Sequence, residues 1–421
     1  MPAPTFFPCY SFLMKYVIII PDGAADLELE QLEAKTPLEA AETPYLDRLG
    51  ERGRQGTVVT TPKRMPCGSD VCTMSLLGYD PARFHTGRAP LEAAALGINL
   101  DPTDWVFRVN LITVVDGCLQ DHSAGHISSE EGRRLLSDFS RIYTVEAMDL
   151  YPGVSYRNIM LDRSATRPDI DSRDWSQLAT IPPHDVPGEP IFKHMPVGRD
   201  NLSLLRQLVA QSEVLFANHE VNLVRRETGE LPATHLWPWG QGRRPSMPLF
   251  ADRFGLNGAM ITAVDLLAGL AQFIGWDRLE VPGQSSYHDN DYAATGQYAA
   301  AALDDYDIVC VHVESPDEAS HAGDAVTKVA AIEAIDQHVV GPIMENLQQR
   351  SEPWRVLVLP DHYTLVDSRV HDPTPVPFLI CGEQVHSVRN RPLTERNAKE
   401  SDLHITYGHE LMEYFLRSGM K

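Results

Sequence analysis

Three short apolar runs, each followed closely by an aspartate, constrain the fold of this chain most strongly. They are Tyr16–Asp22, Asp307–Asp317 and Trp354–Asp361. Continuous Val, Ile and Leu are typical of strands buried on both faces, as in a parallel sheet covered by helices. Helical patterns separate these runs, at residues 44–52, 261–274, 291–303 and 324–350. The alternation predicts a doubly wound, mainly parallel α/β sheet, with all three aspartates at the strand ends where ligands bind.

The middle of the chain has a different character. From about Gly125 to about Arg244 the apolar runs are shorter, and the turns are rich in Pro, Gly and Asp. We expect residues 125–244 to form a smaller α+β lid domain, inserted into a sheet domain made of residues 14–124 and 245–421. Residues 1–13 contain three prolines and no basic residue, so they are a poor signal peptide. We expect them to be a tail, or Met14 to be the natural start.

Charge and composition exclude several classes of partner. The chain has 421 residues, a formal net charge of −22 and no basic cluster, so nucleic acid and anionic membranes are poor partners. Its aliphatic runs are too short to span a membrane. Six cysteines without CxxC spacing are typical of reduced thiols, which favours the cytoplasm. An acidic protein can still bind phosphorylated anions, but it needs local Arg, Lys or metal ions to do so.

Carboxylates and imidazoles gather in the sequence around the three strand ends. The acids are Asp22, Asp317 and Asp361, and the histidines are His321, His362 and His371. Together they could hold two divalent cations by mixed oxygen and nitrogen ligation. A single histidine is better explained as a surface or hydrogen-bonded residue. Six such groups beside buried strands favour metal binding.

A possible nucleophile precedes the predicted helix Val71–Leu77. The segment Gly68–Val71 places Ser69 at the start of this helix. A serine at a helix N-cap has an ordinary structural explanation. Beside two cations the same position favours an alkoxide, and the helix N-terminus can hold phosphoryl oxygens. Cys67 and Cys72 flank Ser69, and we interpret them as packing residues.

Seven motifs, in this order, carry a resemblance to a known family. They are IIIPDGAAD with TPLEAAETPYLDRL, GSDVCTMSLLGYDP, TGRAPLEAAALGI, SPDEASHAGD, PDH and RVHDPTPVPF. The chain resembles the archaeal-type, cofactor-independent (2,3-bisphosphoglycerate-independent) phosphoglycerate mutases of the alkaline phosphatase superfamily. The resemblance implies that Ser69 takes up the phosphoryl group. It also implies one metal ion surrounded by Asp22, Ser69, Asp361 and His362, and a second surrounded by Asp317, His321 and His371. The metals of the family are usually Mn²⁺, with Zn²⁺ or Mg²⁺ as substitutes.

The resemblance also suggests residues that bind a small phosphorylated substrate. Arg88 and Lys328 match family positions near the phosphoryl group. His184 and Asp185 resemble a family lid motif, in which the carboxylate of Asp185 could deprotonate a substrate hydroxyl. Ordinary surface charges and a capping turn are the other interpretations of these residues. Further possible anion-binding residues are Arg157, Lys193, Arg243 and Arg244.

Two segments depart from the archaeal pattern. Where the family usually has an arginine, the stretch Asp121–Ile127 carries His126, and residues 235–245 read HLWPWGQGRRP. An imidazole in place of a guanidinium is not a conservative change at an anion site, because it titrates. We assign His126 a catalytic or substrate-binding role. Both departures resemble a bacterial branch proposed to act as a homoserine kinase.

The predicted function is therefore a metal-dependent isomerase that interconverts 3-phosphoglycerate and 2-phosphoglycerate through a phosphoserine. The alternatives are a homoserine-kinase-like phosphotransferase, a phosphatase and a non-catalytic metal-binding scaffold. The sequence has no Walker P-loop or kinase glycine loop, so a nucleotide would have to bind through the metals. The sequence leaves the oligomeric state open.

Overall fold

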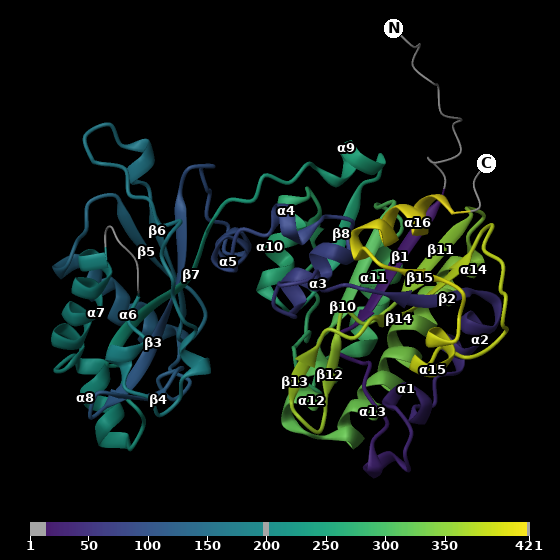
Figure 1. Cartoon of the computed structure of the whole chain (residues 1–421), viewed down its shortest axis with the longest axis horizontal. Coiled ribbons are helices and arrows are strands. Elements are labelled where there is room, and N and C mark those ends of the chain that lie inside the picture. Colours follow the sequence, from purple (N-terminus) through teal and green to yellow (C-terminus); the bar gives the residue numbers. More distant parts are fainter. Residues whose placement is uncertain (1–13, 197–201, 419–421) are drawn as a thin grey trace, which may run out of the picture. The chain divides into compact units, whose positions relative to one another are not determined.

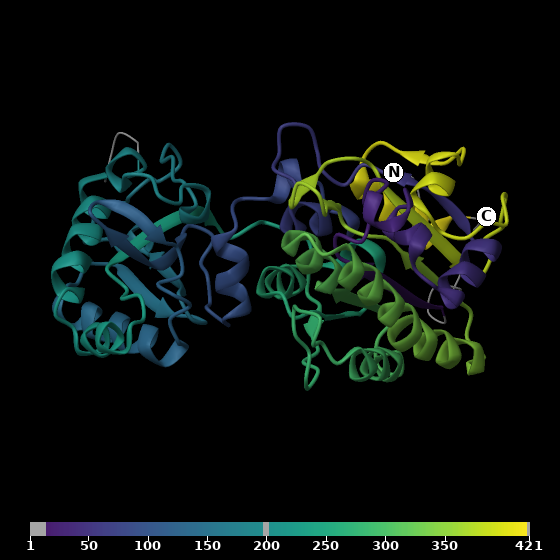
Figure 2. The same cartoon turned by 90° about the horizontal axis from the view of Figure 1, so that it is seen from below.

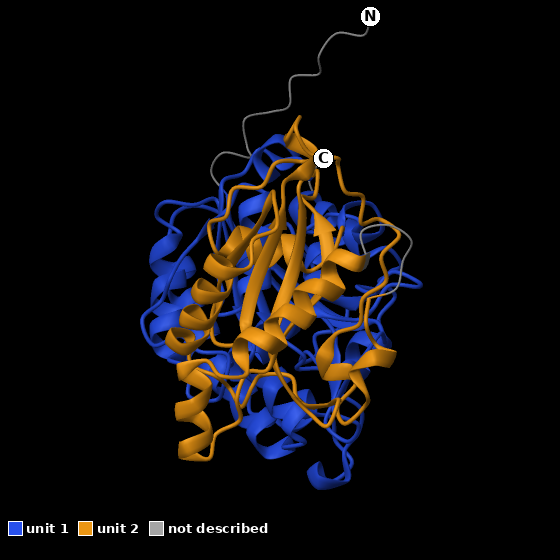
Figure 3. Ribbon diagram, turned by 90° about the vertical axis from the view of Figure 1, so that its left-hand side faces the viewer, with its two compact units in different colours: residues 1–85, 247–421 blue, residues 86–246 orange. Residues whose placement is uncertain are grey.

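The computed structural model describes residues 14–196 and 202–418, so the predicted tail over residues 1–13 lies outside the described residues. The chain forms two compact units, one made of residues 1–85 and 247–421 and the other of residues 86–246 (Figure 3). Within the described residues, no helix has both the length and the apolar character that a membrane crossing requires.

The first unit is built on a mainly parallel sheet (Figure 1). The sheet order is β15 (His404–Ile405), β2 (Arg54–Val58), β14 (Val376–Gly382), β11 (Trp354–Val358), β1 (Lys15–Pro21), β10 (Ile308–Val313), β8 (Gly258–Ile261) and β9 (Asp277–Arg278). Strands β11, β1, β10 and β8 run parallel at its centre, β9 and β15 extend it by parallel pairs, and β14 pairs antiparallel with both β11 and β2. A separate hairpin joins β12 (Tyr363–Leu365) to β13 (Val370–Asp372). The predicted doubly wound, mainly parallel sheet is confirmed.

Helices cover both faces of this sheet. Successive side chains of a strand point to opposite faces, so Val17 and Ile19 pack in one apolar cluster with Ile343 and Leu347, while Tyr16 contacts Phe415. The helices of this unit are α1 (Pro37–Ala40), α2 (Pro44–Arg52), α3 (Ser69–Leu76), α4 (Pro81–Phe84), α9 (Phe250–Phe254), α10 (Asp265–Phe273), α11 (Tyr292–Ala302), α12 (Ser315–Ala322), α13 (Ala325–Ile335), α14 (Gly341–Gln349), α15 (Glu395–Lys399) and α16 (Leu411–Arg417), with 3-10 turns at Glu30–Leu32 and Gly408–Glu410.

Two predicted helices differ from the observed ones. The helix expected over residues 324–350 consists of α13 and α14 joined by a π-helical turn, Asp336–Val340. The ribbons of α13 and α14, in green, lie along one line (Figure 2). In that turn the Asp336 carboxylate accepts the N–H groups of Tyr45 and Leu46 at the start of α2. The helix expected from Ile261 starts later, because Ile261 belongs to β8 and pairs with Val311.

The second unit contains an antiparallel sheet. Strand β3 (Trp105–Val115) pairs with β4 (Cys118–Asp121), β6 (Arg157–Asp162) and β7 (His235–Arg243), and β6 also pairs with β5 (Met148–Pro152). The helices are α5 (Ala89–Ala95), α6 (Ser129–Ile142), α7 (Leu202–Phe216) and α8 (Glu220–Thr228), with 3-10 turns at Ser164–Thr166, Pro183–Asp185 and Ile191–Lys193. Phe107, Val109 and Leu111 of β3 pack against Leu135 and Phe139 of α6.

The unit begins earlier than the insertion expected over residues 125–244. Strand β3 carries most of the pairing of this sheet, so it belongs with β6 and β7, although it lies before residue 125. Helix α5 comes with it, since Glu92 of α5 forms an ion pair of 2.8 Å with Arg108 of β3.

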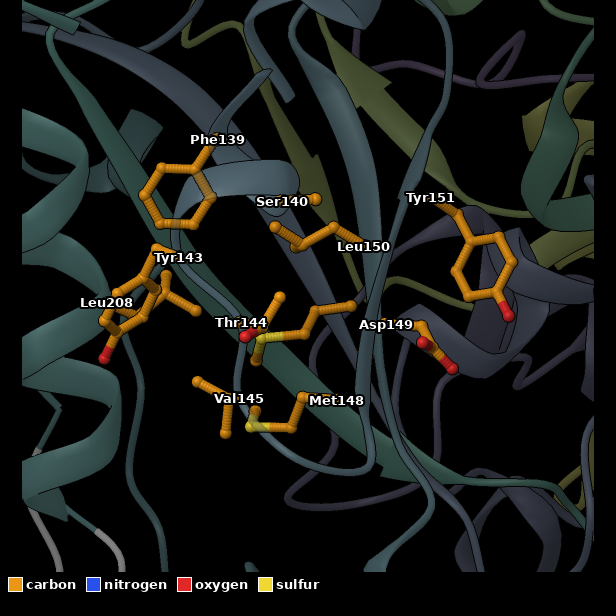
Figure 4. A pocket seen from close by; sticks show the side chains of 11 residues that line it. Phe139, Ser140, Tyr143, Thr144, Val145, Met148, Asp149, Leu150, Tyr151 and Leu208 are labelled. Carbon is orange, nitrogen blue, oxygen red and sulfur yellow. The ribbon is translucent and has the colours of Figure 1, made fainter. Parts of the chain in front are cut away.

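A cavity of about 350 Å³ opens between α6, α7 and β5 of the second unit (Figure 4). Its walls combine apolar side chains, such as Phe139, Met148 and Leu150, with polar ones, such as Thr144 and Asp149. It contains none of the residues predicted to act in catalysis.

Candidate active site

The three predicted acids lie at one edge of the parallel sheet. Asp22 directly follows β1, Asp361 follows β11, and Asp317 lies in the first turn of α12, the helix after β10. Because β1 lies between β10 and β11 in the sheet, these three chain segments emerge side by side. All three carboxylates are buried. A cluster of buried acids is stable only if protons, partners or cations compensate its charge.

Ser69 is the first residue of α3, and Gly68 occupies the N-cap position. This corrects the expectation of a capping serine, because the N-cap residue is Gly68, which has no side chain to accept a hydrogen bond. Its Oγ instead donates to Asp22 Oδ2 at 3.3 Å and lies 3.2 Å from His362 Nε2. The hydroxyl therefore faces the acid cluster.

Asp22, Asp361 and His362 form the first group of donors around Ser69. His362 Nε2 lies 3.5 Å from Asp22 Oδ1 and 3.2 Å from Asp361 Oδ2. Among the described residues, these two carboxylate oxygens are buried without any hydrogen-bond partner. Buried polar atoms without partners are rare and require an explanation. A bound cation would satisfy both.

Asp317, His321 and His371 form the second group. His321 Nε2 lies 3.1 Å from Asp317 Oδ2, His371 Nε2 lies 3.4 Å from Asp317 Oδ1, and the two Nε2 atoms are 3.0 Å apart. The hairpin of β12 and β13 brings His371 to α12, which carries the other two residues.

A glycine allows the two groups to approach each other. Gly23 has a positive φ of 60°, and a Cβ at this position would lie 2.4 Å from Thr364 Oγ1 and 2.7 Å from Asp317 Oδ1. Any side chain would collide with the second group. Gly23 N also donates to Asp361 Oδ1, which fixes that acid.

The three histidines are oriented through their Nδ1 atoms. His321 Nδ1 donates to the carbonyl oxygen of Arg369, and His371 Nδ1 donates to that of Cys67. The hydroxyl of Thr364 donates to Asp317 Oδ1, so it accepts the Nδ1–H of His362. Nδ1 thus carries the proton in each ring, and each Nε2 is directed into the cluster. This arrangement is typical of metal-binding histidines.

Electrostatics of the cluster reflect its uncompensated charge. Burial, together with the charges of Asp361 and Asp317, raises the pKa of Asp22 well above its usual range. Burial alone would also raise the pKa of Asp317, but hydrogen bonds from His321 and His371 hold it well below its usual range. The hydrogen bond to Asp317 raises the pKa of His321 to about 9. Protons on the acids and histidines therefore supply positive charge that cations can replace.

The residues present fit two divalent cations. The donor atoms of Asp22, Asp361 and His362 lie within 4.8 Å of one another, and so do those of Asp317, His362 and His371. His321 Nε2 adds a further nitrogen to the second group. Carboxylate oxygens and imidazole nitrogens suit Mn²⁺ and Zn²⁺, and the oxygens also suit Mg²⁺.

Lys328 lies in a different place from that expected of a substrate-binding residue. Its ammonium group is fully buried and donates to Asp26 Oδ2 at 2.9 Å, to the carbonyl oxygen of Thr364 at 2.7 Å and to that of Ala25 at 3.4 Å. An ammonium group has three N–H donors. None is left for a ligand, so the structure corrects this prediction. Lys328 ties α13 to the segment after β1 and to β12.

The remaining predicted residues lie in the second unit. Arg88 directly precedes α5, His126 lies in the loop between β4 and α6, Arg157 begins β6, and His184 and Asp185 belong to the 3-10 turn Pro183–Asp185. Asp185 is exposed, and its Oδ1 lies 3.7 Å from His184 Nε2.

Aromatic rings connect most of these residues within the second unit. The ring of Tyr156 lies 6.3 Å from that of His126, and its centre lies 5.3 Å from the guanidinium of Arg157. The ring of His122 lies 5.8 Å from Tyr156 and 6.0 Å from His184. His126, Arg157 and His184 therefore belong to one cluster of side chains.

Positive charge dominates the surroundings of this cluster. Arg108 stacks on Trp239 at 4.3 Å, and Trp239 contacts the His184 ring at 5.4 Å. Arg88 lies 4.0 Å from Glu92, which also pairs with Arg108, so two guanidinium groups share one carboxylate. Burial, together with Arg108 and Arg88, lowers the pKa of His184. The cluster suits an anionic ligand.

Two further predicted arginines are used in packing. Arg243 stacks on Trp105 at 4.5 Å, and Arg244 donates to the carbonyl oxygen of Leu100. Lys193 ends the 3-10 turn Ile191–Lys193.

Comparison with known proteins identifies the family. A family model described as 2,3-bisphosphoglycerate-independent phosphoglycerate mutase matches residues 50–222. A protein of that name from Methanothermobacter thermautotrophicus (its number 2) is 42% identical over 96% of this chain and 97% of its own length. The chain belongs to this mutase family. A protein from Geobacter sulfurreducens named as a probable mutase of the same kind is 39% identical over 96% of this chain and all of its own length.

Solved structures agree with this mutase-family fold. A Pyrococcus horikoshii protein has a TM-score of 0.80 at 26% identity and covers 97% of this chain and 99% of its own. A cofactor-independent phosphoglycerate mutase from Thermoplasma acidophilum has a TM-score of 0.64 at 24% identity, over 96% of this chain and 99% of its own.

Sequence reasoning missed two residues of the acid and histidine cluster in the first unit and two residues of the cluster in the second unit of this mutase-family chain. They are Thr364 and His312 in the first unit and Arg108 and His122 in the second. Arg108 and His312 had a signal, since Arg108 is the one charged residue of the largely apolar strand β3 and His312 is the histidine of the apolar strand β10. His122 lies in the stretch that was singled out for His126. Thr364 had no signal, because a threonine in a strand is ordinary.

Proposed function

We propose that the protein interconverts 3-phosphoglycerate and 2-phosphoglycerate by metal-dependent phosphoryl transfer through Ser69. The observation that supports this most is the Ser69 hydroxyl, which lies within hydrogen-bond distance of Asp22 and His362 in a cluster suited to two cations. The family adds the substrate, because near-full-length relatives at about 40% identity are named as mutases of this kind.

In the proposed reaction, Ser69 Oγ bonds to phosphorus as the bond from phosphorus to the 3-oxygen of glycerate breaks. The 2-oxygen of the same glycerate then attacks the phosphoserine, and Ser69 Oγ leaves. The Ser69 hydroxyl proton passes to the leaving 3-oxygen in the first step, and the proton of the 2-hydroxyl passes to Ser69 Oγ in the second. Bound cations would supply Lewis acidity that favours the serine alkoxide and neutralises phosphoryl oxygens.

Residues of the second unit serve the glycerate part of the substrate in this proposal. Arg88, Arg157, His126 and His184 bind anionic oxygens, since they belong to surroundings rich in positive charge. Asp185 takes the proton from the 2-hydroxyl as the 2-oxygen attacks, and that proton then returns to Ser69 Oγ. Its exposure leaves the carboxylate accessible to a substrate hydroxyl.

The cofactor and the setting follow from the same proposal. Two Mn²⁺ ions are the preferred cations, with Zn²⁺ or Mg²⁺ as substitutes, because mixed carboxylate and imidazole sets accept them. The reaction belongs to glycolysis, which implies the cytoplasm. The described cysteines are free thiols, which supports a reducing compartment.

A coupled assay tests the proposal. Metal-free protein is incubated with Mn²⁺ and 3-phosphoglycerate, without 2,3-bisphosphoglycerate, and enolase converts any 2-phosphoglycerate to phosphoenolpyruvate, which absorbs in the ultraviolet. We expect turnover that requires Mn²⁺ and stops with chelator. A parallel reaction contains homoserine and ATP. Phosphohomoserine in that reaction, with no 2-phosphoglycerate in the first, would contradict the proposal.

A further inference from the structure

His312 lies beside the candidate metal centre, although none of the proposed steps uses it. It occupies β10, between β1 and β8, in the apolar sequence IVCVHV. Its side chain is fully buried. Burying an imidazole in the middle of a sheet costs free energy unless both ring nitrogens have partners.

Both ring nitrogens do have partners. His312 Nε2 lies 2.8 Å from Asp22 Oδ2, and His312 Nδ1 lies 3.1 Å from Thr262 Oγ1. The Thr262 hydroxyl also accepts the backbone N–H of Val264 at 3.1 Å. A continuous chain of hydrogen bonds thus runs from the backbone after β8 to a predicted metal ligand after β1.

The direction of each hydrogen bond in this series, from donor to acceptor, follows from the groups at its two ends. A backbone N–H can only donate, and the Asp22 carboxylate can only accept once it is ionised to bind a cation. Thr262 therefore accepts from Val264 and uses its own hydrogen for His312 Nδ1, and Nε2–H of His312 donates to Asp22 Oδ2. One neutral tautomer of His312 satisfies every contact. This tautomer is opposite to that of His321, His362 and His371, whose Nδ1 atoms carry the proton.

The opposite tautomer separates His312 from the metal-binding histidines. Its Nε2 holds a proton against Asp22, so it has no lone pair for a cation. Asp22 Oδ2 receives hydrogen bonds from His312 and Ser69, while Asp22 Oδ1 has no hydrogen-bond partner among the described residues. The two oxygens of Asp22 therefore have different environments.

We propose that His312 is a positioning residue that holds Asp22 Oδ2, so that Oδ1 is presented to a cation while Oδ2 remains beside Ser69. This inference rests on the proposed function, because it assumes that Asp22 binds a metal ion. Partners of metal-binding carboxylates commonly change metal affinity or activity 10- to 100-fold when they are replaced. Thr262 supports His312 by fixing its tautomer.

Three variants test the proposal: His312→Leu, His312→Gln and Thr262→Val. Leucine removes the donor but suits a buried strand. Glutamine can place an amide N–H close to the position of Nε2. Metal-free protein is titrated with Mn²⁺ in a calorimeter, and the melting temperature of each metal-free variant is recorded as a control for folding.

We expect wild-type protein to bind two Mn²⁺ ions. His312→Leu should weaken one of the two sites by about 10- to 100-fold, while His312→Gln should stay within a few-fold of wild type. The loss of Mn²⁺ affinity in Thr262→Val should lie between the losses in the two His312 variants. This change leaves the contact of His312 Nε2 with Asp22 but removes the hydrogen bond that selects the His312 tautomer. KM for 3-phosphoglycerate should change little, and kcat should fall with metal occupancy.

The outcomes separate this inference from the proposed function. Wild-type protein without Mn²⁺ binding would overturn both. Two sites of wild-type affinity in His312→Leu would overturn only the role of His312. If His312→Leu does not fold, His312→Gln decides, and a 10-fold loss there would contradict the proposal. The loss of a nitrogen ligand from the Co²⁺ absorption spectrum of His312→Gln would make His312 a ligand and overturn its positioning role.

Discussion

At the scale of single residues, each imidazole of the metal cluster uses one nitrogen for orientation and leaves the other for chemistry. His321 and His371 are held by backbone carbonyls, and His362 is held by Thr364. Asp317 is the common neighbour of His321 and His371. Protonation of these rings and binding of a cation therefore compete for the same Nε2 atoms.

This competition predicts how metal affinity depends on pH. In metal-free protein the pKa of His321 is raised to about 9 by its hydrogen bond to Asp317. Below that pH a cation must displace a proton, so the affinity for Mn²⁺ should rise with pH, by up to about tenfold per unit for each proton released, and level off above about pH 9. Calorimetric titrations between pH 6.5 and 9.5 measure it. Constant affinity over this range would contradict the assignment of His321 as a ligand.

The same shift has a consequence for the stability of the metal-free protein. The pKa of His321 is raised to about 9 from an ordinary value of about 6.5. The protonated ring therefore stabilises the folded state fully below about pH 6.5, and this contribution disappears as the pH rises through about 9. Denaturant titrations of metal-free protein at about pH 6.5 and above about pH 9 measure this contribution, with His321→Gln as the matched control. The stability that comes from the protonated His321 ring should be lost at the higher pH in wild type only.

His126 provides a second prediction at the residue scale. It lies near Tyr156 in the second unit, at the position where the resemblance places an arginine. A guanidinium stays charged at any working pH and can hold an anion by two hydrogen bonds. His126→Arg should therefore keep or lower KM for 3-phosphoglycerate, whereas His126→Gln should raise it. Steady-state kinetics of both variants measure this. If the wild-type protein uses homoserine and ATP, and His126→Arg turns over 3-phosphoglycerate slowly, the choice of 3-phosphoglycerate as substrate would be overturned.

At the scale of elements, buried polar contacts fasten helices to the segments that carry the acids. Lys328 of α13 binds Asp26, and Asp26 Oδ2 also accepts the backbone N–H of Val366 after β12. Thr364 of β12 accepts from Lys328 with its carbonyl oxygen and donates to Asp317 with its hydroxyl. One lysine thus supports the hairpin on which the second donor group depends.

Removal of Lys328 should therefore destabilise the protein. Lys328→Met leaves Asp26 buried without its cation, and breaking a buried ion pair in this way costs about 3 to 5 kcal/mol. Denaturant unfolding measures the change in free energy. The double variant Lys328→Met with Asp26→Leu should recover part of the loss, since it removes the unpaired charge. A loss of substrate affinity with unchanged stability would restore the original substrate-binding interpretation.

Elements were predictable from sequence where the signal was local. Apolar runs ending in Asp22 and Asp361 identified the buried strands, and their parallel arrangement brought the acids to one edge. Position within the fold was not predictable for Lys328, because a lysine on a helix shows no sign of a buried partner 302 residues away. The start of the second unit was missed because β3 is assigned by its pairing with β7, more than a hundred residues later.

At the scale of the whole molecule, the two units divide the proposed work. The proposed metal ligands all belong to residues 1–85 and 247–421, and most of the proposed substrate-binding residues belong to residues 86–246. Each unit has its own apolar core. Cations should therefore stabilise one unit more than the other.

Thermal unfolding tests this division. A ligand at 100 times its dissociation constant stabilises the folded state by about 2.7 kcal/mol per site. Added Mn²⁺ should raise the melting temperature of the unit that contains Ser69, and chelator should reverse the shift. Hydrogen exchange, measured with and without Mn²⁺ at the same temperature, shows which unit Mn²⁺ protects. Protection by Mn²⁺ confined to residues 86–246 would contradict the assigned ligands.

The central claim is that the phosphoryl group passes through Ser69. The most direct measurement is mass spectrometry of protein quenched with acid during turnover of 3-phosphoglycerate in the presence of Mn²⁺. We predict a phosphoryl group on Ser69 in wild type. Ser69→Ala should fold normally, because the N-cap residue of α3 is Gly68 and not Ser69, and it should lose both the label and turnover. A phosphoryl group on Asp70, Thr73 or a histidine, or full turnover by Ser69→Ala, would contradict the account.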